Sequence, residues 1–177
     1  DYCRQRSLKL HNRNFSVRYE TNIPRQAGLA GSSSIIVATL RCLMKFYGIE
    51  IPIEQQPSLV LSVETEELGI SAGLQDRVIQ VYEGLVYMDL SGEIVEGQGY
   101  GRYEPLDPGL LPRLFLAHRP GPTKVSGRVH DDLRARWERG DPEAHETLDR
   151  IAALAGEGRE ALLRGDQAKK LDELEQE

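Results

Sequence analysis

A loop of small residues between a predicted strand and a predicted helix constrains this chain more than any other feature. Its residues are Gly28, Leu29, Ala30, Gly31, Ser32, Ser33 and Ser34. Glycine permits backbone conformations that are closed to other residues, and the unpaired N–H groups at a helix start attract anions. Serine hydroxyls can donate to phosphate oxygens or ligate magnesium. The loop lacks the Gly-Lys-Ser/Thr of a Walker loop, so it is either another kind of phosphate site or a tight turn with a serine cap.

Local patterns predict the elements on both sides of this loop. Residues 15–20 alternate apolar and polar side chains, which is typical of a half-buried strand. Residues 35–46 form an apolar-rich helical stretch, and Gly48 is a plausible C-cap. Asp141 followed by Pro142 is a good helix start. Further helices are expected at 58–68, from a cap at Ser71 to about Val81, at 129–139, at 142–163 and from Asp166 onward.

The remaining patterns indicate an α+β protein with two layers. Residues 85–90 are strand-like, a turn at 91–92 leads to Ile94 and Val95, and the apolar run 114–117 predicts a buried strand. Glycine and proline crowd together over residues 97–112, where we place a domain boundary.

Charge and composition exclude several classes of function. Lysine and arginine number 22 against 28 acidic residues, a net charge of −6, which argues against general nucleic-acid binding. No apolar run approaches the roughly 20 residues that span a bilayer. Cys3 and Cys42 show no metal spacing, and free thiols in a reducing, cytoplasmic setting are expected. The chain begins at Asp1 without a methionine, as a processed protein or a piece of a longer one would.

Two carboxylates form a second constellation. Glu64 precedes Asp76 by twelve residues, across the break at Gly69. Carboxylates on the ends of adjacent helices can share a site, where one holds a hard cation and the other acts near the substrate. Both could equally be ordinary surface acids, since Asp76 is favourable in the first turn of a helix.

Together these residues resemble the GHMP kinases, the family of galactokinase, homoserine kinase and mevalonate kinase. Residues 24–34 look like the family motif Pro-x-x-x-Gly-Leu-x-Ser-Ser-Ala, with one extra small residue and Ser34 in place of alanine. The Glu64–Asp76 interval resembles the family pattern of a magnesium-binding Glu followed by Gly-x-x-Asp. Residues 22–34 and 68–78 are more narrowly similar to the glucuronokinases, members that phosphorylate the anomeric hydroxyl of glucuronic acid with ATP.

The resemblance implies a fold and a set of site residues. An ATP-binding N-terminal domain over residues 1–104, with a left-handed βαβ crossover, would precede a partial, mostly helical second domain over 105–177. ATP phosphates would lie on residues 28–34, and Mg2+ would bind Ser33 and Glu64. Asp76 would take the proton of the sugar hydroxyl. The substrate carboxylate would meet Arg77 or Arg25, or Lys124 or Arg128 in a later loop.

Three functions stay open at this point. The first is a sugar 1-kinase acting on glucuronate, and the second is a GHMP kinase with another acceptor, such as a galactokinase-like enzyme. The third is a non-catalytic fragment that keeps the fold, because the first and third family motifs have no counterpart in these residues. The expected partners are ATP and a sugar or sugar acid, with neither nucleic acid nor membrane, and the oligomeric state is left open.

Overall fold

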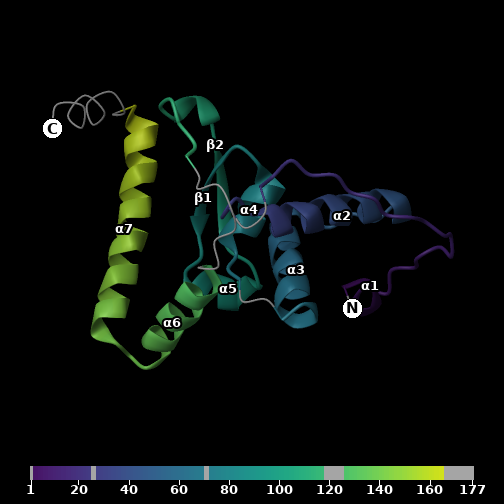
Figure 1. Ribbon diagram of the computed structural model, residues 1–177, viewed down its shortest axis with the longest axis horizontal. Helices are drawn as coiled ribbons and strands as arrows, with labels where there is room; N and C mark the ends of the chain where they lie inside the picture. Colours follow the sequence, from purple (N-terminus) through teal and green to yellow (C-terminus); the bar gives the residue numbers. More distant parts are fainter. Residues whose placement is uncertain (1, 25–26, 70–71, 118–125, 166–177) are drawn as a thin grey trace.

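The computed structural model describes residues 2–24, 27–69, 72–117 and 126–165, and the side chains of 126–131 are not described (Figure 1). Helices α2, α3 and α4 lie on one side of a small sheet, and α7 stands on the other side. The elements are α1 (Tyr2–Gln5), α2 (Gly31–Tyr47), η1 (Ile53–Gln55), α3 (Gln56–Ser62), η2 (Val63–Glu67), α4 (Gln75–Tyr82), β1 (Leu85–Asp89), α5 (Gly92–Gln98), β2 (Arg102–Leu106), η3 (Pro108–Leu110), α6 (Ser126–Glu138) and α7 (Pro142–Arg164).

The sheet of the described residues consists of β1 and β2. They pair antiparallel, from Leu85 opposite Leu106 to Asp89 opposite Arg102. Helices combined with a small antiparallel sheet confirm the predicted α+β class. A βαβ crossover needs two parallel strands, and β1 and β2, which are joined through α5, do not form one.

Helix α2 carries the candidate phosphate loop at its start. It begins at Gly31, four residues before the predicted start, because the serines of the loop already adopt helical geometry. Its N-cap is Ala30, which has a left-handed backbone (φ 52°). Gly48 ends the helix at φ 66°, and its N–H donates to the Met44 carbonyl, as the C-cap prediction required.

A small aliphatic cluster joins the three helices that position the site. Val37 of α2, Val60 of α3 and Val81 of α4 are each at most 2% exposed and pack together. Three partly buried side chains surround them, namely Ile36, Leu40 and Tyr82. The contact fixes the start of α2 relative to η2, which follows α3 directly and in which Glu64 lies one helical turn after Val60.

The strand predicted at residues 15–20 does not form. A strand needs a partner for its backbone N–H and C=O groups, and within the described ranges no segment pairs with this one. Phe15 of this segment contacts α2 instead, with its ring centroid 5.0 Å from that of Phe46, and the preceding His11 lies 4.8 Å from Tyr47 between ring centroids.

One further strand expectation was wrong, and the turn expected at residues 91–92 leads into a helix. Ile94 and Val95 lie in helix α5, which begins directly after Ser91 and ends at Gly99 with φ 81°. The run 114–117 adopts neither strand nor helix. Its member Phe115 is 81% exposed, so this run is not a buried strand in the described part of the chain.

The C-terminal helices follow the local signals. Asp141 caps α7 by accepting hydrogen bonds from the N–H groups of Glu143 and Ala144, as predicted. Arg159 of α7 then reaches Glu104 of β2, with two N···O distances of 2.8 Å. This pair links α7 to the sheet. The helix expected from Asp166 onward lies outside the described residues.

Two predictions from composition can be compared with the structure. Cys3 and Cys42 are free thiols, as expected. Among the helices of the described ranges, none combines the length and apolar character needed to cross a membrane.

Candidate active site

The small-residue loop passes directly into the first turn of α2. Gly28 (φ 73°) and Ala30 (φ 52°) both take the left-handed conformation, which turns the chain into the helix. Gly28 and Ser32 are exposed, so backbone and hydroxyl groups of the loop are open to a ligand. The loop therefore combines a turn, free helix N–H groups and accessible serines, as a phosphate site requires.

The serines of the loop have different environments. Ser34 donates its hydroxyl proton to the Gly31 carbonyl at 2.8 Å, so it closes the first turn of the helix. Ser33 is 0% exposed, and its Oγ has no hydrogen-bond partner within the described residues. A buried hydroxyl without a partner costs free energy. A ligand bound to the loop could therefore provide the partner that Ser33 Oγ lacks.

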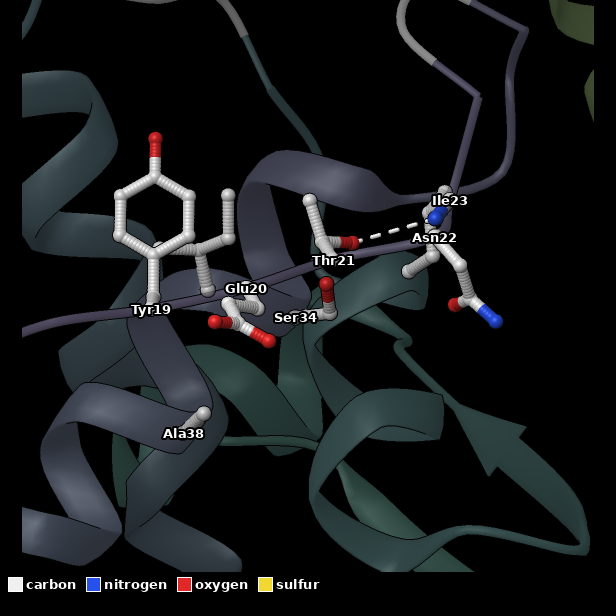
Figure 2. Close-up of a pocket in the computed structure, with 8 residues that line it drawn as sticks. Tyr19, Glu20, Thr21, Asn22, Ile23, Ser34 and Ala38 are labelled. Carbon is white, nitrogen blue, oxygen red and sulfur yellow. Dashed lines mark hydrogen bonds between the residues drawn. The ribbon is translucent and has the colours of Figure 1, made fainter.

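A cavity of about 590 Å³ lies along the outer side of this helix start (Figure 2). Segment 19–23 runs across α2 there, and the Thr21 hydroxyl accepts a hydrogen bond from the Ile23 N–H at 3.1 Å. The lining residues are Tyr19, Glu20, Thr21, Asn22, Ile23, Ser34, Ile35 and Ala38. The sequence patterns did not predict that residues 19–23 line a cavity, because they indicated a strand up to Glu20.

One of the two predicted carboxylates, Glu64, forms a buried ion pair with Arg77. Glu64 is 0% exposed and Arg77 is 4% exposed. The Arg77 Nε donates to Glu64 Oε2 at 2.5 Å, and Nη2 contacts the same oxygen. The remaining nitrogen, Nη1, donates to the Gly73 carbonyl at 2.9 Å. Glu64 is therefore not the ordinary surface acid of the alternative interpretation.

The second oxygen of Glu64 is left without a partner. Oε1 is buried and makes no hydrogen bond within the described residues, which is the same condition as that of Ser33 Oγ. Ser33 lies one helical turn before Val37, and Glu64 lies one helical turn after Val60. Val37 and Val60 both belong to the aliphatic cluster described above. No hydrogen bond joins the two oxygens. Hydroxyl and carboxylate oxygens are ligands that suit Mg2+.

Asp76 stands at the exposed side of the ion pair. It lies in the first turn of α4, its side chain is 56% exposed, and its Oδ2 is 3.6 Å from Arg77 Nη1. Arg77 thus contacts both carboxylates that the sequence singled out. The structure joins Glu64, Arg77 and Asp76 directly.

The other proposed substrate contacts are placed differently. The Arg77 guanidinium, expected to meet a substrate carboxylate, donates to Glu64 and Gly73 instead. Arg25 and Lys124 lie outside the described residues, and the side chain of Arg128 does as well. The cap at Ser71 is also outside them, and the N-cap of α4 is Leu74.

A further cavity of about 780 Å³ lies between β1 and α7 and reaches Gln75, the neighbour of Asp76. Its wall is mainly aliphatic, with Leu85, Val86, Leu106 and Leu148 among the lining residues. Such a wall suits apolar groups better than a charged sugar acid. The polar loop and the carboxylates remain the better candidate site.

Comparison with known proteins found a matching family model and similar relatives. Residues 2–84 match the model of the GHMP kinases N terminal domain. The chain is 48% identical over 171 residues to Glucuronokinase 1 and 50% identical over 169 residues to Probable glucuronokinase 2, both of Arabidopsis thaliana. These matches cover 96% and 94% of this chain.

More distant similarity extends to other kinases. The chain is 27% identical over 159 residues to a mevalonate kinase of Pyrococcus horikoshii, a match that covers 90% of the chain and 42% of that kinase. The two Arabidopsis matches cover 47% and 46% of those proteins, so the chain spans about half the length of these relatives. No solved structure matches the chain.

Proposed function

Residues 2–84 belong to the GHMP kinase N-terminal domain family, and on that premise we propose that the protein transfers the γ-phosphoryl group of ATP to the anomeric hydroxyl of glucuronate. The observation that carries this proposal is the identity of 48% and 50% to two proteins named as glucuronokinases, over nearly the whole chain. The geometry of the loop and of the buried carboxylate supports the same chemistry.

The loop of residues 28–34 is proposed to hold the phosphates. Backbone N–H groups at the start of α2 donate to phosphate oxygens, and the helix dipole favours negative charge there. Ser32 is exposed and can add a hydroxyl donor. Since the chain as a whole carries a net charge of −6, this local arrangement must provide the attraction for an anion.

Residues in η2 and at the start of α2 fit a magnesium ion. Two buried oxygens, Glu64 Oε1 and Ser33 Oγ, have no partner in the described part of the chain. Mg2+ is commonly held by one or two protein oxygens together with substrate phosphates. When bound, it would neutralise charge on the transferring phosphate.

Asp76 is proposed to act on the acceptor. It is exposed, and it lies next to Arg77, which holds it beside the Glu64 carboxylate. As the sugar hydroxyl oxygen bonds to the γ-phosphorus, the bond from that phosphorus to ADP breaks, and Asp76 takes the hydroxyl proton. Phosphoryl transfer relies mainly on positioning and electrostatics, so an ordinary carboxylate is a sufficient base.

Phosphorus NMR of the protein with Mg2+, ATP and glucuronate tests the proposal. A sugar 1-phosphate signal that grows as ADP appears is the expected result. A parallel panel with galactose, mevalonate and heptose phosphate distinguishes glucuronate from other acceptors of the family. Magnesium-dependent ATP binding without any product across the panel would contradict the proposed transfer and favour a non-catalytic role.

A further inference from the structure

Two arginine–glutamate pairs in this chain differ in how the guanidinium meets the carboxylate. Arg159 forms an ordinary fork with Glu104, because its Nε donates to Oε2 and its Nη2 donates to Oε1, both at 2.8 Å. In the other pair, Arg77 Nε and Nη2 both contact Glu64 Oε2. Glu64 Oε1 receives no hydrogen bond from the described residues.

The pair that leaves an oxygen without a partner is the buried one. Its side chains are 5% and 0% exposed, whereas those of Arg159 and Glu104 are 31% and 40% exposed. Water can hydrogen-bond to the oxygens of the exposed pair. A buried carboxylate oxygen has no such partner, so its desolvation costs free energy. The lack of a hydrogen-bond partner for this buried oxygen is explained if another group binds it during function.

We propose that Arg77 is a positioning residue, which holds Glu64 by one oxygen so that Oε1 faces the metal ion. This inference rests on the proposed function. Loss of a group that orients a metal ligand typically lowers metal affinity by about 10- to 100-fold. A cation at Oε1 also supplies the partner that this oxygen lacks.

Arg77 positions Asp76 relative to Glu64 as well. Its Nη1 donates to the Gly73 carbonyl, three residues before Asp76, and lies 3.6 Å from Asp76 Oδ2. One guanidinium therefore connects η2 with the start of α4. The proposed metal ligand and the proposed base move together only while this connection is intact.

The opposing interpretation is that Arg77 only neutralises a buried charge. A lysine would also neutralise Glu64, but a single ammonium cannot reproduce the planar contact that Arg77 makes with Glu64 and Gly73. Arg77→Lys therefore separates positioning from neutralisation. Arg159→Lys is the matched control, since the same change is made in an exposed pair of the same chain.

The experiment measures binding of Mn2+, as a spectroscopic substitute for Mg2+, with a non-hydrolysable ATP analogue by electron paramagnetic resonance. We expect Arg77→Lys to weaken Mn2+ binding by about 10- to 100-fold. Affinity for the analogue without metal should change less than about threefold, and Arg159→Lys should match the unmodified protein. A folded Arg77→Lys variant with unchanged Mn2+ affinity would overturn the inference.

A second measurement needs no substitution and covers the case in which Arg77→Lys fails to fold. The Arg77 Nε–H resonance of the unmodified protein is followed by 15N NMR while Mg2+ and the analogue are added. It should stay protected from solvent exchange, since the pair persists when Oε1 is engaged. Loss of protection on metal binding would contradict the inference. If the unmodified protein shows no metal-dependent nucleotide binding, the proposed function itself fails.

Discussion

Arg77 and Glu64, thirteen residues apart in sequence, form an ion pair whose side chains are 5% and 0% exposed. Removing two charges from water is expensive, and their mutual attraction often does no more than offset that cost. A pair of this kind is therefore poor evidence for stability. Because Arg77 also contacts Asp76, this pair connects the candidate metal ligand Glu64 with the proposed base, which gives it a functional explanation.

Removal of the arginine should destabilise the protein far more than removal of the whole pair. Arg77→Met leaves Glu64 as an uncompensated buried charge and should lower the free energy of unfolding by about 3–5 kcal/mol. The double variant Glu64→Gln/Arg77→Met should recover a substantial part of that loss. Urea unfolding of both variants measures the difference. A double variant as unstable as the single one would mean that the buried charge is not the cause.

Turnover and nucleotide binding should respond differently at Asp76. This carboxylate is exposed and is proposed to contact the acceptor hydroxyl, whereas the phosphates are assigned to the loop. Asp76→Asn should lower the rate of sugar 1-phosphate formation by about 10²- to 10⁴-fold. The affinity for ATP, measured by calorimetry, should remain within about threefold. Equal losses of rate and affinity would contradict the role assigned to this residue.

The loop should show opposite effects at its two left-handed positions. Gly28 has φ 73° and open space around an added Cβ, so Gly28→Ala introduces backbone strain alone. We expect a loss of about 1–2 kcal/mol in the free energy of unfolding. Ala30 already carries that strain at φ 52°, so Ala30→Gly should be neutral or stabilising by up to about 1 kcal/mol. Thermal and urea unfolding provide both values, and a costless Gly28→Ala would show that the turn does not require glycine.

Lowering the pH should destabilise the start of α7, because the capping carboxylate of Asp141 becomes protonated. The hydrogen bond from the Arg136 guanidinium is the main cause that lowers the pKa of this carboxyl, and the N–H groups of Ala144 and Glu143 add to it. A lowered pKa in the folded state means that the contribution is present above the unfolded value near pH ~3.9. It is lost as the pH falls through the folded pKa.

The change Asp141→Asn keeps a capping side chain but removes the titrating charge. Urea unfolding of this variant and of the unmodified protein, from pH 6 down to pH 2, should show a stability difference that shrinks as the solution becomes more acidic. A difference that stays constant over this range would mean that Asp141 does not carry the effect.

The elements predicted correctly depend on local signals. Gly48 ends α2 and Asp141 caps α7 because a cap acts within a few residues of itself. Strands depend on distant partners. The alternation at 15–20 matched a strand pattern, but within the described ranges nothing pairs with it, and Phe15 packs on Phe46 instead. The apolar pair Ile94–Val95 was equally ambiguous, since so short a run fits a helix or a strand.

The sequence predicted which residues make up the candidate site, but not how they contact one another. The motif pointed to the loop, Glu64 and Asp76, and the structure brings the two carboxylates to one guanidinium. The pairing of Arg77 with Glu64 could not be read from the chain, because it depends on how α3 and α4 cross. Opposite charges on neighbouring predicted helices were the only signal, and many surface residues share that signal.

The wide turn η2, which holds Glu64, has a consequence for how related sequences can vary. The Leu68 N–H bonds the Val63 carbonyl at 3.2 Å, five residues back rather than four. Such turns accommodate one additional residue within an α-helix, and each residue rotates a helix by about 100°. Deletion of one residue from this turn would restore the ordinary pattern of hydrogen bonds four residues back, and the side chains before and after it would keep their directions. Related sequences can therefore be one residue shorter at this turn, whereas Val60 and Glu64, which are both buried, tolerate little exchange.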